Sequence, residues 1–407
     1  MKLENKNVLV TGISGFVGSH LAKHLSDQGA SVDGLIRKRS DGTVSKNLDN
    51  VKDDVRLIEG DLTDISSLAF ALDGSTPDVI FHLGAQSFVP RSFTHPLETL
   101  NSNTMGTANL LEAVRLKDLD PIIVFAGSSE EYGLVISSEE QYNQVKRKYS
   151  EIYPEVDKIP ELPITEKNPL RPLSPYALSK VQGEYLMRDY YYSYGMKTII
   201  SRGFNHEGAG RGSMFVTSVI ANQVMKLKLG EAEKIAIGNV NAFRDWSHVD
   251  DIIKGYCLLA EKEKVGNAHN QGSMRTNSIL SYILLSLELA GWKVEKIATI
   301  RNEKEIKGPV ENDASEAFGV KFDKTKVDRL MLQDELEFTI EDKGIWAYTD
   351  KGKILIEFDP GRFRDADVPI LMSDTRKIQN LGFRIEHELE DIIRDQFNYF
   401  MKKENRV

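Results

Sequence analysis

The chain has 407 residues, of which 41% are hydrophobic and 28% charged, with a formal net charge of −9. This composition excludes an extended disordered chain. The acidic balance argues against general affinity for nucleic acids, although a local basic cluster can still hold an anionic ligand. Cys257 is the only cysteine, no apolar run is long enough to cross a bilayer, and the N-terminus lacks the apolar core of a signal peptide. We therefore expect a cytoplasmic protein with no internal disulfide and no membrane or nucleic-acid partner.

Short apolar runs alternate with helical patterns through roughly the first 260 residues. The helical patterns include residues 17–25 and 107–114. This alternation predicts βαβ units, and therefore an α/β fold with a Rossmann-type doubly wound parallel sheet. The apolar runs lie at residues 8–10, 32–36, 55–58, 79–83 and 122–125.

The alternation breaks after Gly272, where a helix (278–289), a hairpin (344–358) and a final helix (386–403) are predicted. We expect a smaller, mixed C-terminal lobe beside the Rossmann domain. The Rossmann domain would comprise residues 1–203 and about 235–265, and the lobe residues 204–234 and 266–407 with an insertion at 294–360. A second charged stretch, at 134–164, predicts a solvated surface insertion.

A glycine-rich turn follows the first predicted strand. Gly12, Gly15 and Gly18 lie between that strand and an amphipathic helix. Glycines at this place let the backbone approach a pyrophosphate and present N–H groups at a helix N-terminus. The spacing alone is a weak signal, but the strand before it and the helix after it predict a site for a nicotinamide dinucleotide.

The end of the second predicted strand indicates which dinucleotide binds. Ile36 stands where NAD-binding proteins carry an acid for the ribose 2′-hydroxyl, and Asp33 lies too early, inside the strand. Arg37 and Arg39 follow, and arginine suits a 2′-phosphate, so we expect NADP rather than NAD. A solvated basic loop is the alternative for these arginines. Asp61, after the third strand, is expected to meet the adenine edge or to cap a helix.

A tyrosine and a lysine four residues apart form a candidate proton-transfer pair. Tyr176 and Lys180 share one helical face, where a lysine ammonium would lower the pKa of the phenol and let tyrosinate take a proton near neutral pH. Only this pair opens a helix after a proline and leads to another core strand, so we assign the other pairs to the surface. The spacing occurs three times: Tyr142 with Lys146, Tyr176 with Lys180, and Tyr399 with Lys403.

A loop rich in hydroxyls and acids follows the run at 122–125, and it contains Ser128, Ser129, Glu130 and Glu131. Open parallel sheets bind their ligands at such loops, beyond the carboxyl ends of strands. A hydroxyl here can bond a substrate hydroxyl or carbonyl, and a carboxylate can abstract a carbon-bound proton. A strand-end turn with an exposed acid pair is the alternative, and the tyrosine–lysine pair argues against it.

Taken together, these segments resemble the extended short-chain dehydrogenase/reductases and, within them, the GDP-mannose 4,6-dehydratase family. The resemblance covers most of residues 7–273 and resumes near Arg364. The matching segments are residues 11–18, 82–89, 103–107, 128–133, 174–180, 204–207, 211–217 and 243–248.

The resemblance implies a nucleotide-sugar 4,6-dehydratase. It would convert a GDP-hexose, GDP-mannose above all, to the 4-keto-6-deoxy sugar by internal hydride transfer through NADP, without a metal. Tyr176 would take the proton of the sugar 4-hydroxyl, Ser128 would hold that oxygen, and Glu130 would remove the C5 hydrogen before water leaves from C6. Lys180 completes the catalytic set.

The resemblance also implies a set of binding residues and an oligomer. The family's helix pairing implies a homodimer or homotetramer, with the helices at 104–115 and 176–194 as candidates. The implied cofactor-binding residues are Gly12, Ser14, Gly15, Phe16, Val17, Gly18, Arg37, Arg39, Asp61, Leu62, Leu83, Ala85, Tyr176 and Lys180. The implied substrate-binding residues are Ser87, Ser129, Asn205, Arg211, Val216, Arg244 and Arg364.

The chain departs from the family pattern in several places. The stretch from Gly133 to Tyr176 and the region 294–360 are enlarged, and Arg364 is followed by Asp365 where the family usually has proline. The Gly-x-Gly that ends residues 204–210 resembles GDP-6-deoxy-4-keto-mannose reductase instead. That reductase, a nucleotide-sugar 4-epimerase and a non-catalytic NADP-sensing regulator therefore stay open as alternatives. The acid in the loop after the 122–125 run favours the dehydratase, and the retained tyrosine and lysine argue against the regulator.

Overall fold

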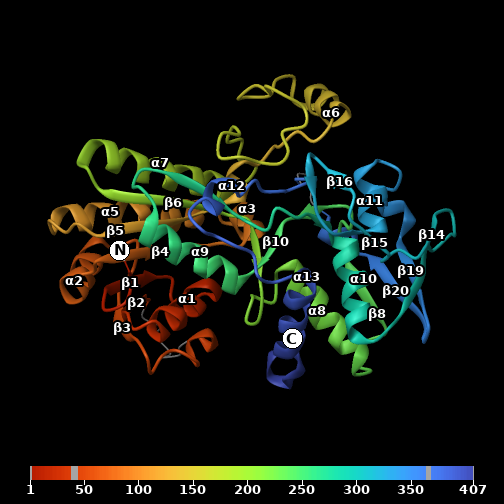
Figure 1. The fold of residues 1–407 in the computed structure, drawn as a ribbon, viewed down its shortest axis with the longest axis horizontal. Coiled ribbons are helices and arrows are strands. Elements are labelled where there is room, and N and C mark those ends of the chain that lie inside the picture. Colours follow the sequence, from red (N-terminus) through yellow and green to blue (C-terminus); the bar gives the residue numbers. More distant parts are fainter. Residues whose placement is uncertain (1, 38–44, 364–367, 407) are drawn as a thin grey trace.

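The computed structural model describes residues 2–37, 45–363 and 368–406. Two main sheets lie toward opposite ends of the long axis of the molecule, and each has helices packed against it (Figure 1). Within the described residues, no helix is both long enough and apolar enough to span a membrane.

The larger sheet has seven strands in the order β11-β6-β5-β4-β1-β2-β3. All neighbouring strands in it run parallel, which confirms the predicted Rossmann-type sheet. The chain runs from β1 outward to β3 and then returns to β4 on the other side of β1, so the topological switch point lies between β1 and β4. The strands are β1 (Asn7–Thr11), β2 (Ser31–Ile36), β3 (Arg56–Glu59), β4 (Val79–His82), β5 (Ile122–Ser128), β6 (Lys197–Gly203) and β11 (Ala268–Gln271).

Helices cover both faces of this sheet (Figure 1). On one face, α1 (Phe16–Asp27) and α9 (Val249–Lys262) bury their apolar sides in one core cluster. On the other face, α2 (Ile65–Ser75), α5 (Gly106–Leu116) and α7 (Pro175–Tyr194) share a second cluster. Because both faces are covered, all four residues of β4 are buried, which is why this strand reads as a continuous apolar run.

The smaller lobe is built on a five-stranded sheet with the order β14-β13-β19-β20-β8. The hairpin predicted at 344–358 is confirmed as the antiparallel pair β19 and β20. Three helices, α8 (Val216–Lys228), α10 (Ile279–Ala290) and α13 (Leu389–Met401), share a core cluster with this sheet. The strands are β8 (Lys234–Ile237), β13 (Val294–Thr299), β14 (Glu305–Lys307), β19 (Gly344–Thr349) and β20 (Gly352–Phe358).

The sheet membership of two strands differs from the predicted division of the chain. β8 pairs with β20 in the smaller lobe, although residues from about 235 onward were expected in the Rossmann domain. β11 is the edge strand of the parallel sheet next to β6, although residues from 266 onward were expected in the lobe. Each strand has only four residues, and the apolar pattern of so short a strand does not reveal which sheet it joins.

The charged stretch at 134–164 is only partly the solvated insertion that was predicted. Its helix α6 (Glu139–Tyr149) has no buried residue. Leu162, however, lies in a core cluster, and the carboxylate of Glu161 forms an ion pair with Arg171 in which both side chains are 4% exposed. The segment is therefore anchored to the body of the protein at its C-terminal end, while α6 and residues after it, such as Tyr153 at 84% exposed, lie on the surface.

Short elements complete the fold. β7 pairs in parallel with β10, and β9 pairs antiparallel with β12. The remaining helices are α3 (Val89–Thr94), α4 (Pro96–Leu100), α11 (Lys326–Leu332) and α12 (Arg376–Gln379). The remaining strands are β7 (Asn205–Glu207), β9 (Phe243–Arg244), β10 (Trp246–His248), β12 (Asn277–Ser278), β15 (Asn312–Asp313), β16 (Glu316–Ala317), β17 (Val320–Lys321) and β18 (Lys324–Thr325).

Candidate active site

The turn after β1 has a geometry that requires glycine. Gly12 has a φ of +72°, and a Cβ on it would lie 2.7 Å from the backbone nitrogen of Gly84. A Cβ on Gly18 would lie 2.2 Å from the carbonyl oxygen of Gly12. No side chain caps the N-terminus of α1, so its first N–H groups suit the pyrophosphate of a dinucleotide. The predicted residues Ser14, Gly15, Phe16 and Val17 lie in this turn and the first turn of α1.

The loop after β4 lies beside the glycine turn. The Gly84 N–H donates to the Thr11 hydroxyl at the end of β1, with a nitrogen–oxygen distance of 3.0 Å. This contact places the loop that carries Leu83 and Ala85 at the switch point between β1 and β4, as the predicted cofactor site requires. The Leu62 side chain packs against the same loop, because a Cβ on Gly84 would lie 2.8 Å from Leu62 Cδ1.

Asp61 has one of its two predicted roles taken by a neighbour. Its carboxylate accepts hydrogen bonds from the N–H and the hydroxyl of Thr63, both at 2.8 Å. The N-terminus of α2 is capped instead by Asp64, whose carboxylate accepts from Ser66 N–H at 2.9 Å. The expectation that Asp61 caps the helix is therefore wrong, and contact with the cofactor is the role that stays predicted.

The residues predicted to select the cofactor lie at the end of β2. Arg37 is exposed there, and Arg39 lies outside the described residues. Asp33 is committed to the sheet, because Nε and Nη2 of Arg56 bind its carboxylate at 2.7 and 2.6 Å. No carboxylate of β2 therefore reaches beyond the strand toward a ribose.

Helix α7 sets the position of the tyrosine–lysine pair. The Ser174 hydroxyl accepts from Ala177 N–H at 3.0 Å and so fixes the first turn of the helix. Tyr176 and Lys180 are 8% and 5% exposed, and the lysine Nζ lies 6.0 Å from the centre of the tyrosine ring. The ammonium donates to the Ala126 carbonyl of β5 at 2.8 Å, which ties the helix to the strand that carries the catalytic loop.

The pKa values of this pair differ from the sequence expectation. Burial raises the pKa of Tyr176 to about 12, although a hydrogen bond with Ser128 opposes the rise. Burial lowers the pKa of Lys180 to about 8, against the attraction of Glu131. Desolvation is the largest influence on the pKa of this buried phenol. That Lys180 assists proton transfer at Tyr176 stays a prediction.

The two acids after β5 point to different surroundings. Glu130 lines the pocket described below. Glu131 is completely buried, and its Oε1 accepts from Ser128 N–H at 2.7 Å. Burial and the neighbouring Glu184 raise the pKa of Glu131 well above its usual range. Burial also acts to raise the pKa of Glu184, but hydrogen bonds from Arg202 outweigh it and lower that pKa to about 2.

A cavity of about 810 Å³ lies between the parallel sheet and the smaller lobe. Three catalytic candidates, Ser128, Glu130 and Tyr176, line it. The structure also brings the predicted substrate residues of the described part to the same wall, from five separate stretches of chain. These residues are Ser87, Ser129, Asn205, Arg211, Val216 and Arg244.

The predicted arginines have different surroundings in the cavity. Arg211 lies 3.4 Å from the carboxylate of Glu207, and its guanidinium stands 3.6 Å from the centre of the Phe215 ring. Arg244 donates through Nη1 to the carbonyl oxygens of Phe243 and Val368, at 2.8 and 2.7 Å. Arg364 lies outside the described residues. Two cationic side chains thus reach the described cavity wall from the predicted positions.

Sequence reasoning missed several residues of the site. Phe88 and Phe215 face each other across the cavity wall with ring centres 5.8 Å apart, and Arg362 also lines the cavity. His82 is buried at the end of β4 between the hydroxyls of Thr11 and Thr107, at 2.8 and 3.0 Å. For His82 the sequence did carry a signal, because a histidine ends an otherwise apolar strand. The aromatic pair had none, because its members lie on loops far apart in sequence.

Comparisons with known proteins agree on one family. The family model described as GDP-mannose 4,6 dehydratase matches residues 9–149 and 141–338. A GDP-mannose 4,6-dehydratase of Sinorhizobium fredii (strain HH103) is 28% identical over 410 residues, which cover 97% of this chain and 98% of that protein.

Solved structures share the fold. RMD from Pseudomonas aeruginosa, complexed with NADPH, superposes with a TM-score of 0.66 at 22% identity and covers 97% of this chain and 99% of its own. DesIV, a dTDP-glucose 4,6-dehydratase from Streptomyces venezuelae with NAD bound, gives a TM-score of 0.65 at 22% identity and covers 98% and 97% of the two chains. Neighbours of this fold thus bind either nicotinamide cofactor.

Proposed function

The chain belongs to the GDP-mannose 4,6-dehydratase family, and we propose that it is a 4,6-dehydratase acting on a GDP-hexose, with GDP-mannose as the preferred substrate and NADP as the cofactor. The observation that carries this proposal is the meeting of Ser128, Glu130 and Tyr176 on one cavity wall. A carbonyl reductase needs a tyrosine and a hydroxyl at the sugar C4 oxygen. The added carboxylate in the same cavity is what elimination of water requires.

The glycine turn supports a dinucleotide at the switch point. Side chains at Gly12 and Gly18 would fill the space that the turn leaves, and α1 offers an uncapped N-terminus to the pyrophosphate. When bound, the nicotinamide would supply reversible hydride transfer, so that the sugar is oxidised at C4 and later reduced at C6 with no net change in the cofactor. Arg37 at the end of β2, where the one carboxylate of the strand, Asp33, is bound to Arg56, supports NADP.

The side chains of the cavity then divide the proton transfers. Tyr176 takes the proton of the C4 hydroxyl, and Ser128 holds that oxygen by a hydrogen bond. The C4 ketone makes the C5 hydrogen acidic, and Glu130 removes it as a proton. The C6 hydroxyl leaves with a proton as water, and C5 regains a proton when the C5–C6 double bond is reduced. The overall balance is the loss of one water from the sugar.

Lys180 acts on Tyr176 through charge. Burial lowers the pKa of Lys180 to about 8, so at neutral pH the side chain is still mostly an ammonium, whereas burial raises the pKa of Tyr176 to about 12. The phenol accepts the C4 proton only as tyrosinate, and a positive charge nearby favours that form. The lysine ammonium on the next turn of α7 is the group placed to do so.

The cavity also supports an anionic nucleotide sugar. Arg211 and Arg244 reach it, and guanidinium groups bind diphosphates by paired, charge-assisted hydrogen bonds. The rings of Phe88 and Phe215, which meet edge to face, add apolar aromatic surface to the cavity wall, against which a base could pack.

A substrate screen tests the proposal. The purified chain is incubated with GDP-, UDP- and CDP-hexoses, each with NADP and with NAD, and the products are weighed by mass spectrometry. GDP-mannose with NADP should give a product lighter by one water, with the cofactor unchanged. Water loss from no nucleotide hexose would overturn the proposal, and stoichiometric NADPH oxidation by a 4-keto-6-deoxy sugar nucleotide would identify the chain as the reductase.

A further inference from the structure

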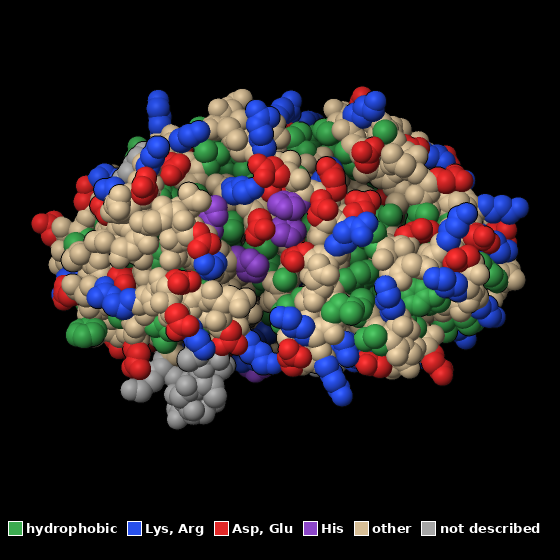
Figure 2. Space-filling model, turned by 60° about the horizontal axis from the view of Figure 1, so that its bottom comes forward, with side chains coloured by type: hydrophobic (Ala, Val, Ile, Leu, Met, Phe, Trp, Pro, Cys, Tyr) green, Lys and Arg blue, Asp and Glu red, His purple; other side chains and the backbone are tan. Residues whose placement is uncertain are grey.

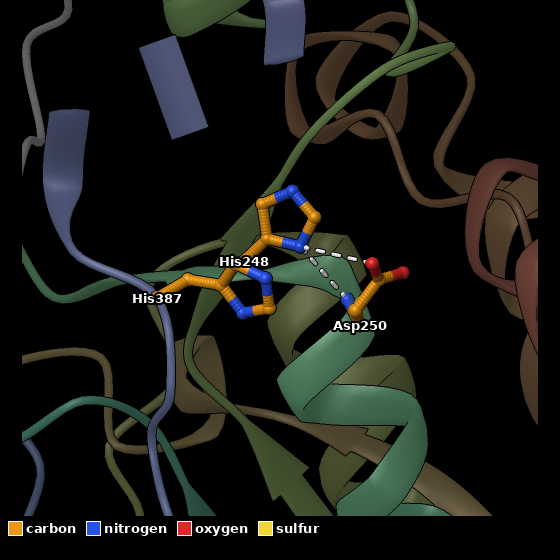
Figure 3. Close-up of side chains that lie close together, drawn as sticks. All are labelled: His248, Asp250 and His387. Carbon is orange, nitrogen blue, oxygen red and sulfur yellow. Dashed lines mark hydrogen bonds and ion pairs between the residues drawn. The ribbon is translucent and has the colours of Figure 1, made fainter. Parts of the chain in front are cut away.

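Two histidines and an aspartate form a cluster outside the catalytic cavity. His248 ends β10, Asp250 lies in the first turn of α9, and His387 lies on the segment that leads into α13 (Figure 3). One ligand atom from each residue lies within 4.8 Å of the other two. Among the described residues, this is the one group of three histidine, cysteine or acidic side chains that meets this condition. On one face of the molecule, Figure 2 shows histidine side chains gathered near its middle among charged groups.

Each imidazole in the cluster is held from its far side by a carboxylate. Nδ1 of His387 lies 3.0 Å from Oδ1 of the completely buried Asp251, and Nε2 of His248 lies 3.3 Å from Oδ2 of Asp395. Carboxylates in such positions fix the proton on the ring nitrogen that they contact, so the other nitrogen keeps its lone pair. This carboxylate–histidine arrangement is the usual support of histidines that bind metals.

An independent contact agrees with this assignment for His248. Its Nδ1 accepts a hydrogen bond from Asp250 N–H at 3.2 Å, so that nitrogen carries a lone pair and not a proton. The Asp250 carboxylate lies on the same side, with Oδ2 3.6 Å from the same Nδ1 (Figure 3). An ion bound at Nδ1 would therefore replace the Asp250 N–H at this lone pair and would lie beside the Asp250 carboxylate.

The charge around the cluster favours a cation. Asp250, Asp251 and Asp395 bring three carboxylates to it. His20 adds a further imidazole, with Nδ1 3.8 Å from Oδ1 of Asp250 and with Nε2 bound to the Ala209 carbonyl at 3.0 Å. The guanidinium of Arg275, which lies close by, donates to the backbone carbonyl of His387 and pairs with Glu388.

We propose that His248, Asp250 and His387 bind one divalent transition-metal ion, with Zn²⁺ as the best fit, and that the ion links the start of α9 to the segment before α13. Two imidazoles and one carboxylate, completed by water, are a ligand set that Zn²⁺ and its neighbours in the first transition row accept. The site is structural and distinct from the catalytic cavity, so it does not depend on the proposed dehydratase activity. It departs from the expectation of a protein without a metal.

Binding requires one side chain to turn. The two imidazole rings are stacked, with centres 4.3 Å apart and an angle of 22° between their planes, so their lone pairs run nearly parallel. A common ion needs the ring planes to open toward each other. His387 is the side chain that turns, because it is 30% exposed whereas His248 is 7% exposed. No sequence pattern indicates the site, since His387 is far along the chain from the other two ligands.

Metal titration of the full-length chain tests the proposal. The protein is produced without a histidine tag, treated with a chelator, and titrated with Zn²⁺ by calorimetry at about pH 8, where free imidazole is neutral. We expect one ion per chain and a rise in Tm on binding. Co²⁺ should give the visible absorption of a low-coordinate nitrogen and oxygen site.

Two variants and a control locate the ion. H387A removes one ligand, D250N keeps the shape of the second while removing its charge, and each should weaken Zn²⁺ binding at least about tenfold. H95Q, a change at an exposed histidine on another part of the surface, should leave binding unchanged. If the chain binds no Zn²⁺ with one-to-one stoichiometry, or if both ligand variants bind it as tightly as the parent chain, the proposal is wrong.

Discussion

Tyr176 is the group that accepts the proton of the sugar C4 hydroxyl in the proposed reaction. It is buried, its pKa is raised to about 12, and it contacts Ser128 beneath the cavity. Removing only the hydroxyl, in Y176F, leaves the ring packed and the fold intact. We expect the dehydration rate to fall by about two to four orders of magnitude, the range of a general acid–base group. The rate is measured by mass spectrometry of the product, and circular dichroism checks the fold.

A variant that kept full turnover would contradict the assignment of Tyr176. A protein that only senses its cofactor would also keep its function after this change, so Y176F separates enzyme from regulator. Binding of the dinucleotide, measured by calorimetry, should survive the substitution in either case.

The neighbouring acids give a matched pair of substitutions. Glu130 lines the cavity, whereas Glu131 is buried, accepts from Ser128 N–H, and has a pKa raised by burial and by Glu184. E130Q should block loss of water while still allowing oxidation at C4. The absorbance of the reduced form of the cofactor would reveal this oxidation. E131Q should retain most of the activity, because a glutamine carbonyl still accepts from that N–H and its amide still donates to Glu184.

Reversal of these two results would show that the acids have been assigned the wrong way round. A third variant, E131L, has the shape but neither polar atom, and it should lose activity because Ser128 N–H is left without its acceptor. Activity in E131Q but not in E131L would identify Glu131 as a positioning residue.

At the scale of elements, sequence patterns located the long helices and the parallel strands well. Their signals were strong because every strand of the larger sheet except the edge strand β3 is largely buried and each helix has one apolar side. The short strands β8 and β11 were placed in the wrong sheets, since four residues carry no information on their partners. The segment 134–164 was predicted to be a solvated insertion from its charge alone. No sequence pattern indicates that Glu161 forms a buried ion pair with Arg171.

Helices α5 and α7 and the residue before α5 present apolar side chains that stay exposed among the described residues. Met105, just before α5, is 52% exposed, and Leu178 and Tyr185 on α7 are 41% and 60% exposed. We propose that these helices pair across a homodimer. The double variant M105E/Y185E should halve the molar mass that light scattering measures. Four negative charges would then meet in the dimer interface, where they are shielded from water.

F70E is the matched control for this test. Phe70 on α2 is 73% exposed, so its replacement adds the same charge away from the proposed interface. The dimer should persist in F70E. A parent chain that is monomeric, or a double variant that stays dimeric, would contradict pairing through α5 and α7.

For the whole molecule, buried neutral histidines predict loss of stability in acid. Burial lowers the pKa of His82 to about 3, below its ordinary value of 6.5. In the unfolded chain the His82 imidazole becomes protonated as the pH falls through 6.5, whereas in the folded protein it becomes protonated only near pH 3. The free energy of unfolding should therefore fall with falling pH across this window, by about 1.4 kcal/mol per pH unit from this group.

Urea unfolding of the parent and of H82Q at pH values from 7 to 5 tests this effect. The parent should lose about 2 kcal/mol more than H82Q over that interval, the share that one histidine accounts for. His206, with a pKa lowered by burial to about 4, adds to the slope in both proteins equally. Equal slopes in parent and variant would show that His82 is protonated in the folded state.

The site as a whole was predictable in part. Ser128, Tyr176 and the glycine turn were found because each is a local motif beside a strand end. The facing rings of Phe88 and Phe215 were missed because only the folded chain brings two loops together. The raised phenol pKa was missed for a similar reason: spacing along a helix shows which groups are neighbours, but not how far they are removed from water.

The most direct measurement follows the hydride itself. GDP-mannose carrying deuterium at C4 is incubated with the chain and NADP, and the product is examined by mass spectrometry and NMR. The proposed dehydratase predicts a product that has lost one water, keeps the deuterium and carries it at C6, with no net change in the cofactor. Deuterium released into reduced cofactor, deuterium returned to C4 with no loss of water, or unchanged substrate would each contradict internal transfer from C4 to C6.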